Sequence, residues 1–227
     1  MHKEIIKKIK SKKIKIGIVG LGYIGLPISL AFCKKKFEVI GFDKDNKRLN
    51  LLKKSISYIG TISNGFLKRF INKNFFVTSD FSKLKKVDII IICVPTPINK
   101  DKTPDLNYIK SAVIEIKKNL RAGQTIISEC TTYPGNTEEF LIPLLKKKRF
   151  KIGKNIFLGY SPEREDPGNK KFSILKNNIP KVVSGFSENC KRILKQVYSQ
   201  ISKKVYLVEN IKTAEFTKLF ENIYRSV

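Results

Sequence analysis

The sequence predicts an α/β protein built on a doubly wound parallel sheet. Strand and helix patterns alternate along almost the whole chain, as they do in parallel sheets covered by helices on both faces. Residues 87–95 are rich in Ile and Val, which is typical of a strand buried on both faces. A glycine-rich turn follows the first apolar strand and opens a helix. The length of 227 residues and the hydrophobic content of 41% suit one large α/β domain, or one domain and the beginning of another.

The elements follow one another in a regular order. Strands are expected over residues 15–20, 38–43, 75–79, 87–95, 125–131, 155–161, 181–185 and 204–208. Helices are expected over residues 1–13, 23–35, 45–54, 106–120, 136–148, 187–199 and 212–227. The first helix is short, basic and amphipathic, with Ile5, Ile6 and Ile9 on its apolar side. We therefore expect a basic lead-in helix (1–14), a sheet domain (15–210) and the start of a further helix (211–227), which no cap or breaker closes.

The net charge of +27 comes mostly from lysine, since 39 of the 46 basic residues are Lys and 7 are Arg. Nucleic-acid-binding proteins favour Arg for its bidentate contacts to phosphate and guanine. The lysines are scattered in twos and threes without a nucleic-acid-binding motif, so we interpret the charge as a compositional bias and expect no nucleic-acid partner. A basic nucleic-acid-binding protein is an alternative that rests on charge alone. The charge would still attract anionic ligands over long range.

The four cysteines, Cys33, Cys93, Cys130 and Cys190, form no CxxC motif, and His2 is the only histidine. A metal site is therefore not expected. Cysteines without a pairing pattern suit the reducing cytoplasm. The charged N-terminus lacks the apolar stretch of a signal peptide, and the longest apolar run is far too short to span a bilayer. The sequence thus predicts a cytoplasmic protein without a membrane partner.

The glycine-rich turn matches the dinucleotide-binding fingerprint G-x-G-x-x-G. Its glycines allow a tight turn, close approach of the pyrophosphate and close packing of the helix whose N-terminus faces the phosphates. An acidic residue, Asp43, ends the next strand 23 residues after the first glycine, where the ribose hydroxyls are expected. Its carboxylate favours NAD over NADP, although Lys44 and Arg48 complicate this preference. The fold is therefore expected to be Rossmann-like, with NAD as cofactor; a glycine turn in an unrelated α/β protein is the alternative. The predicted cofactor contacts are Gly20, Gly22, Tyr23, Ile24, Gly25, Asp43 and Arg48.

Four further motifs follow the turn in order. They are residues 94–97 (VPTP), 129–135 (ECTTYPG), 161–168 (SPEREDPG) and 214–222 (AEFTKLFEN). Together with the glycine-rich turn they resemble the UDP-glucose/GDP-mannose dehydrogenase family of nucleotide-sugar 6-dehydrogenases, over essentially the whole chain from Lys15. The EDPGN run and residues 179–183 (IPKVV) look most like the UDP-N-acetylglucosamine 6-dehydrogenase branch. The resemblance implies a UDP-sugar substrate.

The resemblance also implies roles for particular residues. Thr96 lies in a loop that lines the cofactor in the family, and a plain structural turn is the alternative. Thr132 corresponds to the family's catalytic threonine, which orients water and the sugar hydroxyl beside the cofactor. Glu163 corresponds to a glutamate that activates water as a general base, against the alternative of a surface ion pair. Arg164 would hold a substrate phosphate or contact a partner subunit.

The last motif lies on the final helix. Lys218 and Asn222 are four residues apart and so share one face of a helix, with Leu219, Phe220 and Ile223 on the other side. In the family these two residues donate hydrogen bonds to the oxyanion that develops at C6 of the sugar. A solvated Lys with a polar neighbour is the alternative. The resemblance identifies this helix as the start of the central, dimer-forming helix.

The family's reaction consists of two oxidations with two NAD, in which a cysteine captures the intermediate aldehyde and water hydrolyses the resulting thioester. In the family that cysteine lies beyond the central helix, in a motif that none of the four cysteines here matches. We therefore expect this chain to be a fragment that cannot complete the reaction alone. The full-length family would form a homodimer, or a partner chain would carry the missing half. Two rival interpretations stay open: a different β-hydroxyacid-type dehydrogenase, and a non-catalytic NAD-binding module that regulates or completes a partner chain.

Overall fold

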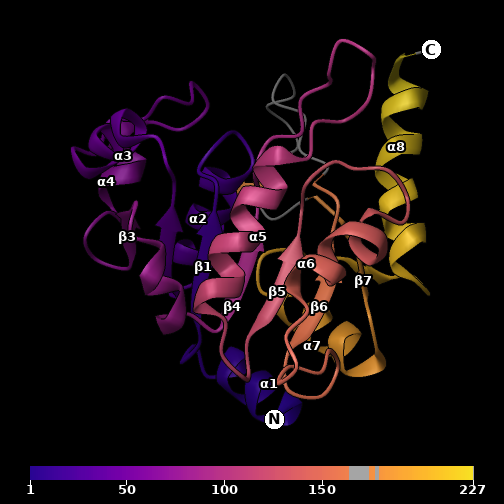
Figure 1. Cartoon of the computed structure of the whole chain (residues 1–227). Coiled ribbons are helices and arrows are strands. Elements are labelled where there is room, and N and C mark those ends of the chain that lie inside the picture. The colour runs from indigo at the N-terminus through magenta and orange to yellow at the C-terminus, as the bar shows by residue number, and fades with distance from the viewer. Residues whose placement is uncertain (164–173, 177–178, 227) are drawn as a thin grey trace.

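The computed structural model of the chain describes residues 1–163, 174–176 and 179–226. Eight strands form one sheet in the order β3-β2-β1-β4-β5-β6-β7-β8. Figure 1 shows the sheet from β3 on the left to β7 on the right. The strands are β1 (Lys15–Val19), β2 (Glu38–Phe42), β3 (Phe75–Thr78), β4 (Ile89–Ile92), β5 (Thr125–Ser128), β6 (Phe157–Tyr160), β7 (Lys181–Gly185) and β8 (Val205–Leu207). The first six strands are parallel in the order 3-2-1-4-5-6, so the predicted Rossmann-like, doubly wound α/β fold is confirmed.

Each predicted helix is present, with ends that differ by a few residues. The α-helices are α1 (His2–Lys10), α2 (Gly25–Lys34), α3 (Asn46–Lys53), α4 (Asn64–Lys68), α5 (Asn107–Asn119), α6 (Ile142–Leu145), α7 (Glu188–Tyr198) and α8 (Ile211–Ser226). Three further turns are η1 (Phe81–Lys86), η2 (Thr137–Leu141) and η3 (Ile174–Lys176). The sequence patterns did not indicate α4, η1 or η3, which are short.

The continuous helix expected over residues 136–148 is wrong in detail. A π-helical turn, η2, fills its first part, and α6 ends at Leu145. Pro143 explains the break, because its ring nitrogen has no hydrogen to donate to the carbonyl four residues earlier.

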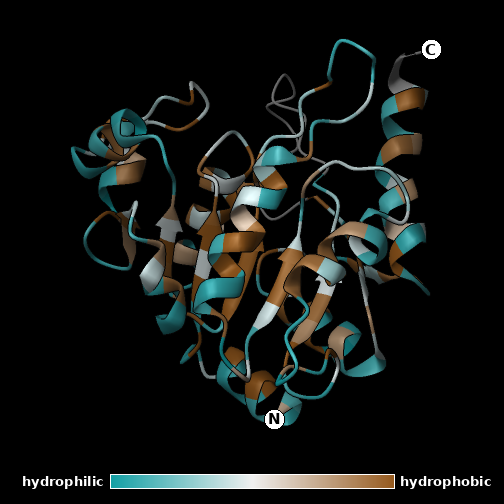
Figure 2. Cartoon of the chain, viewed as in Figure 1, coloured by the Kyte–Doolittle hydropathy of each residue, from teal (hydrophilic) through white to brown (hydrophobic). Residues whose placement is uncertain are grey.

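The core lies in two layers, one on each face of the sheet. Ile89 and Ile91 pack into one layer with α1, α2 and α7, while Ile90 and Ile92 pack into the other with α5 and α6. All four side chains are fully buried, as predicted for this strand. Figure 2 shows the strands in brown between helices whose outer surfaces are teal. In α1, Ile5 and Ile9 are buried against α7, whereas Ile6 is only half-buried.

One strand pair departs from the predicted parallel sheet. β7 runs antiparallel to β6, with Gly159 opposite Gly185 and Tyr160 opposite Ser184. An antiparallel neighbour does not need the crossover helix that a parallel neighbour requires. β8 then pairs with β7 in parallel. Because of this reversal, β7 begins at the edge of the sheet where β1, β4, β5 and β6 end.

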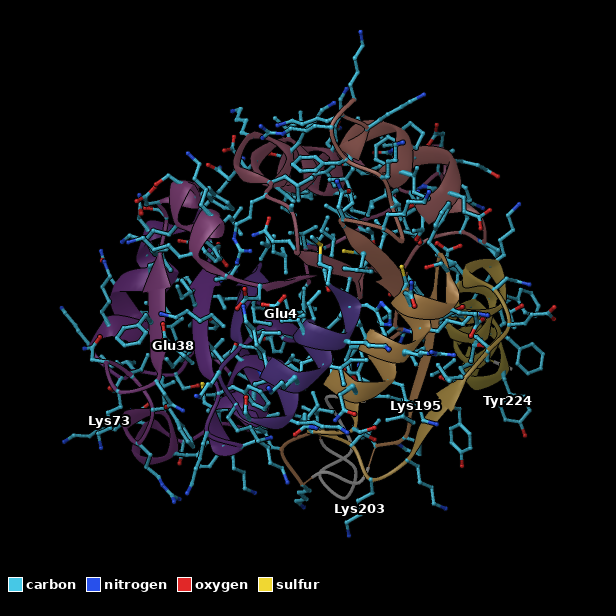
Figure 3. The ribbon with its side chains drawn as sticks, turned by 90° about the horizontal axis from the view of Figure 1, so that it is seen from below. Glu4, Glu38, Lys73, Lys195, Lys203 and Tyr224 are labelled. Carbon is cyan, nitrogen blue, oxygen red and sulfur yellow. The ribbon has the colours of Figure 1, made fainter. Side chains whose placement is uncertain are left out.

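The final helix, α8, lies at one side of the molecule and leads to the C-terminal end of the chain (Figure 1). It contacts β6, β7 and η2. Its buried side is formed by Ile211, Ala214 and Glu215. Its other side is exposed and apolar, and Tyr224 projects away from the sheet in Figure 3. Among the described residues, no helix combines the length and the apolar character that crossing a membrane would require.

Candidate functional site

The glycine-rich turn joins β1 to α2 at the carboxyl edge of the sheet. Gly20 has a φ of +92°, and a Cβ added there would lie 2.7 Å from the carbonyl oxygen of Cys93. A Cβ added at Gly25 would lie 1.8 Å from the carbonyl oxygen of Gly20. Only glycine fits these two positions, because one needs the left-handed conformation and the other has no room for a side chain. At Gly22, by contrast, an added Cβ would meet no atom within 4 Å, so the space beside it is open.

Asp43 follows β2 and is 8% exposed. Its Oδ2 accepts a hydrogen bond from the backbone N–H of Leu21 at 2.9 Å and one from the Arg48 guanidinium at 2.8 Å. The guanidinium of Arg48 also lies over the ring of Tyr58, with 5.4 Å between its carbon and the ring centroid. Arg48 stands in the first turn of α3, which the side chain of Asp45 caps. The acidic residue of the fingerprint is therefore fixed against the glycine-rich turn.

A pocket of about 960 Å³ opens beside the turn. It lies where the strand order reverses between β1 and β4, the position at which open α/β sheets bind ligands. Six of the predicted cofactor contacts line it: Gly20, Gly22, Tyr23, Ile24, Asp43 and Arg48. The other predicted cofactor contacts, Gly25, Thr96 and Thr132, are not among its lining residues. An open space beside Gly22, the N-terminus of α2 and a buried carboxylate at the end of β2 are the features that hold a dinucleotide.

Sequence reasoning missed the wall of this pocket opposite the turn. Asp105, Asn107, Tyr108, Ser111 and Ala112 line it from α5 and the loop before it. The Nζ of Lys44 donates a hydrogen bond of 2.5 Å to the hydroxyl of Ser111, across the pocket. No motif marks these residues, because α5 has the ordinary pattern of a helix that covers a sheet.

Thr96 and Thr132 lie in the loops after β4 and β5. The hydroxyl of Thr96 donates a hydrogen bond of 2.6 Å to the carbonyl oxygen of Thr131 and so ties the two loops together. Thr132 is 6% exposed, and its hydroxyl makes no hydrogen bond of ordinary geometry within the described part of the chain. A buried hydroxyl without a partner is uncommon, which makes Thr132 a candidate for contact with a ligand or water.

Glu163 follows β6 and is 2% exposed. Its Oε2 lies 2.7 Å from the Nζ of Lys181, which also lies 2.8 Å from Oε2 of Glu129. The hydroxyl of Tyr198 donates a hydrogen bond to Oε1 of Glu129. We call these four residues the buried cluster: Glu129, Glu163, Lys181 and Tyr198. The prediction of Glu163 as a functional residue did not include this environment.

The cluster's charges are set by burial and by one another. Burial would lower the pKa of Lys181, but the carboxylates of Glu129 and Glu163 raise it above its ordinary value. Burial raises the pKa of Glu129 to about 7; the ammonium of Lys181 opposes this change and the charge of Glu163 adds to it. The lysine is therefore charged, and its two carboxylates compete for it.

Lys218 and Asn222 are half-buried on α8, whereas Leu219, Phe220 and Ile223 on its other side are exposed. Lys218 and Asn222 thus lie on the less exposed side of α8, and the role predicted for them stays a prediction. Arg164, the remaining predicted residue, lies outside the described residues.

The helix α8 is fastened to the rest of the site by Glu215. Its carboxylate accepts hydrogen bonds from the backbone N–H of Gly135 at 2.6 Å and of Thr137 at 2.9 Å. It also accepts one from the hydroxyl of Thr137 at 2.7 Å. The loop that contains Thr132 and the helix that carries Lys218 are joined through this one side chain.

The four cysteines are unpaired and buried. Burial raises the pKa of the Cys130 thiol to about 12 and raises the pKa values of Cys33 and Cys93 further. A thiol acts as a nucleophile only as the thiolate, so these three do not have the character of reactive cysteines.

The sheet order, the turn and the pocket define a dinucleotide-binding domain of the dehydrogenase type. Residues 14–202 match the model of the NAD binding domain of the UDP-glucose/GDP-mannose dehydrogenase family. The chain belongs to this family, and the predicted resemblance is confirmed. NAD is therefore the cofactor of the domain.

Named relatives agree with the family. The chain is 40% identical over 214 residues to Protein CapL of Staphylococcus aureus, and this match covers 93% of the chain and 49% of the relative. It is 37% identical over 217 residues to the UDP-N-acetyl-D-glucosamine 6-dehydrogenase of Salmonella typhi, covering 95% of the chain and 50% of the relative. The structure of the UDP-N-acetyl-mannosamine dehydrogenase Cap5O from Staphylococcus aureus matches with a TM-score of 0.84 and 30% identity, over 93% of the chain and 50% of that protein. The chain thus spans about half the length of the relatives it matches.

Proposed function

We propose that this chain is the NAD-binding half of a nucleotide-sugar 6-dehydrogenase. Its substrate would be a UDP-N-acetylhexosamine, UDP-N-acetylglucosamine or a similar sugar, whose C6 alcohol is oxidised to the uronic acid with two NAD. Two of the named relatives are a UDP-N-acetyl-D-glucosamine 6-dehydrogenase and a UDP-N-acetyl-mannosamine dehydrogenase, which supports this class of substrate. The main observation in support of this proposal is the position of two residues: Thr132 follows β5 and Glu163 follows β6. Both therefore lie at the edge of the sheet that also holds the dinucleotide pocket beside β1 and β4.

The cofactor would be held by the turn and by the end of β2. The N-terminus of α2 and the space beside Gly22 suit the pyrophosphate, and the Asp43 carboxylate suits the ribose hydroxyls. NAD, when bound, accepts the hydride that leaves C6 of the sugar. Thr96 would support the pocket indirectly, because its hydroxyl is committed to the carbonyl of Thr131.

The chain's own polar groups would manage the proton and the developing charge. The buried Thr132 hydroxyl would orient the sugar hydroxyl or a water molecule. The Glu163 carboxylate would take a proton, directly or through water, as a general base. Lys218 and Asn222, on the inner side of α8, would donate hydrogen bonds to the oxygen at C6 as negative charge develops on it. Arg164 would contact a substrate phosphate or a partner subunit.

Completion of the acid product would need a further part of the enzyme. The second oxidation requires a nucleophilic thiol, and burial raises the pKa values of Cys33, Cys93 and Cys130, so these three are poorly suited to that role. We propose that this chain alone is inactive and that the thiol comes from a substrate domain beyond the segment 211–227. Residues 15–210 would be the NAD-binding domain, preceded by a lead-in helix (1–14), in a homodimer or with a partner chain. Unpaired cysteines are consistent with a cytoplasmic protein.

The test is calorimetric titration of the purified chain with NAD, alone and with UDP-N-acetylglucosamine, followed by an assay for reduced cofactor. We expect NAD to bind without turnover. Formation of NADH that depends on the UDP-sugar would show that the chain is active alone. A folded chain that binds no NAD would contradict the proposed function. A non-catalytic NAD-binding module, the second candidate, predicts NAD binding that the UDP-sugar does not change.

A further inference from the structure

The buried cluster contains a lysine that is completely removed from water. Lys181 is 0% exposed, Glu129 is 1% exposed and Glu163 is 2% exposed. Charged side chains are almost never buried to this degree unless they are paired, and pairing only partly offsets the loss of hydration. An apolar side chain at the start of β7 would serve the core as well, so packing alone does not account for this lysine.

The reversal of β7 brings Lys181 to the functional edge of the sheet. Gly159 pairs with Gly185 and Tyr160 pairs with Ser184 in the antiparallel register. If the same antiparallel register is continued by three residues, Glu163 lies opposite Lys181. A parallel β7 would begin at the opposite edge of the sheet, far from the residues that follow β5 and β6.

The ammonium of Lys181 is held from both sides. Its Nζ donates hydrogen bonds of 2.8 Å to Glu129 and 2.7 Å to Glu163, both of them charge-assisted. The same atom lies over the ring of Tyr198, 5.0 Å from the centroid. The hydroxyl of Tyr198 in turn donates a hydrogen bond to Glu129. The lysine therefore has a fixed position, and Glu129 and Tyr198 fix it.

The two carboxylates are not equivalent. Glu129 has a second partner in Tyr198 of α7, within the core. Glu163 is the last residue that the structure describes after β6 before residue 174, and it belongs to the motif that carries the proposed general base. The thiol of Cys93, which lines the dinucleotide pocket, lies near enough that the carboxylates add to the effect of burial in raising its pKa. Cys130 and Tyr160 are further titratable groups near Glu129.

Building on the proposed function, we propose that Lys181 is a positioning residue for Glu163. Its ammonium, anchored by Glu129 and Tyr198, fixes the Glu163 carboxylate at the end of β6 and keeps it ionised and ready to accept a proton. Glu129, together with Tyr198, holds the lysine in place through its hydrogen bonds and does not itself contact the substrate.

The charge balance of the cluster supports this division of roles. Two carboxylates and one ammonium leave one excess negative charge in a buried site, so the two carboxyl groups titrate as a coupled pair. We expect the proton taken up near neutral pH to settle on Glu129, whose pKa burial raises to about 7. Glu163 then retains the direct ion pair with Lys181.

The experiment follows the side-chain carboxyl signals of the full chain, labelled with ¹³C at glutamate, by NMR across a pH series. Glu129→Gln and Glu163→Gln identify the two signals. We expect Glu163 to be ionised at neutral pH in the natural chain. In Lys181→Met the titration midpoint of Glu163 should rise by about 1–3 pH units, because the variant loses an opposite charge that lowers the pKa of a carboxyl group by this amount at such a distance. Lys181→Arg, which keeps the charge, should restore a midpoint close to the natural one.

A lysine with a merely structural role would change stability and leave the Glu163 midpoint where it was, and that result would overturn the inference. If Lys181→Met does not fold, Glu129→Gln provides the test. In this variant the titration near neutral pH that is assigned to Glu129 should disappear, and Glu163 should stay ionised. A midpoint near neutral pH that is found on Glu163 would overturn the inference. NAD binding to the natural chain is measured separately. Its absence would contradict the proposed function without affecting the titration of the cluster.

Discussion

The carboxylate of Glu215 in α8 accepts a hydrogen bond of 2.6 Å from the backbone N–H of Gly135, in the turn that follows Thr132. The side chain is fully buried and makes two more hydrogen bonds, both to Thr137. Burial raises the pKa of Glu215, and the hydrogen bonds that it accepts oppose that change. Glu215 therefore positions the helix that carries Lys218 together with the buried Ile211 and Ala214.

Glu215→Gln should loosen α8. The amide keeps the size of the side chain, but its nitrogen cannot accept the hydrogen bonds that the carboxylate oxygens accept now. We expect a loss of about 2–3 kcal/mol in the free energy of unfolding, in the range for hydrogen bonds to a charged group. Hydrogen exchange should be faster in α8 than in the natural chain.

Glu138→Gln is the matched control, because Glu138 is exposed and its ion pair with Lys212 is a long 3.9 Å. It should change the unfolding free energy by less than about 1 kcal/mol. Equal effects of the two substitutions would contradict the role assigned to Glu215.

The glycines of the turn should separate folding from cofactor binding. Gly25→Ala places a methyl group 1.8 Å from the carbonyl oxygen of Gly20. We expect this substitution to lower the free energy of unfolding by about 1–3 kcal/mol or more. Gly22→Ala meets no protein atom within 4 Å, so its melting temperature should stay close to that of the natural chain. The added methyl group would instead occupy space that the pyrophosphate needs, and calorimetry should find NAD binding weakened by about tenfold or more. Normal NAD affinity in Gly22→Ala would place the pyrophosphate elsewhere.

Much of the fold could be predicted because its signals are local. The fully apolar strand β4, the glycines of the turn and Asp43 at the end of β2 each indicate their structure within a few residues. The family motifs add the candidate residues after β5 and β6 and on α8.

What could not be predicted depends on contacts between distant residues. The antiparallel direction of β7 is set by its pairing with β6, and no pattern within five residues distinguishes it from a parallel strand. Lys181 was an available signal, since a lysine that opens a strand otherwise buried must find a partner. Which carboxylates it meets could not be inferred, because Glu129 lies 52 positions earlier in the sequence.

Asp43 should determine both the affinity for NAD and the preference over NADP. Asp43→Asn removes the charge while keeping the size of the side chain. We expect the NAD dissociation constant to rise about 10–100-fold, the equivalent of about 1.5–3 kcal/mol for hydrogen bonds to a charged group. NADP should become a better ligand relative to NAD, because the carboxylate no longer repels its 2′-phosphate and Arg48 remains beside it.

Glu188→Gln is the charge-matched control for this measurement. Glu188 is exposed at the start of α7, where it pairs only with Lys191 among the described ion pairs, and it does not line the pocket. Calorimetry should find its NAD affinity unchanged. A similar loss of affinity in both variants would mean that net charge, and not a contact with the ribose, accounts for the effect.

The buried carboxyl group of Glu129 should make stability depend on pH. Its pKa in the folded chain is raised to about 7 from an ordinary value of 4.5. Between these values the folded chain holds a proton that the unfolded chain has released, so the free energy of unfolding falls as the pH rises through this window. Lys181 stays charged throughout it, because its pKa is raised. Glu129→Gln removes the slope, and Glu4→Gln, an exposed change, should keep it.

The measurement is urea unfolding of the natural chain and both variants, from about pH 5 to about pH 8. As the pH rises between those limits, the free energy of unfolding of the natural chain should fall by on the order of 1–3 kcal/mol relative to that of Glu129→Gln, since a shift of one pKa unit corresponds to about 1.4 kcal/mol. A difference that stays constant with pH would mean that Glu129 does not take up the proton. Another group would then take up the proton, and the assignment of Glu163 as the ionised partner of Lys181 would fail with it.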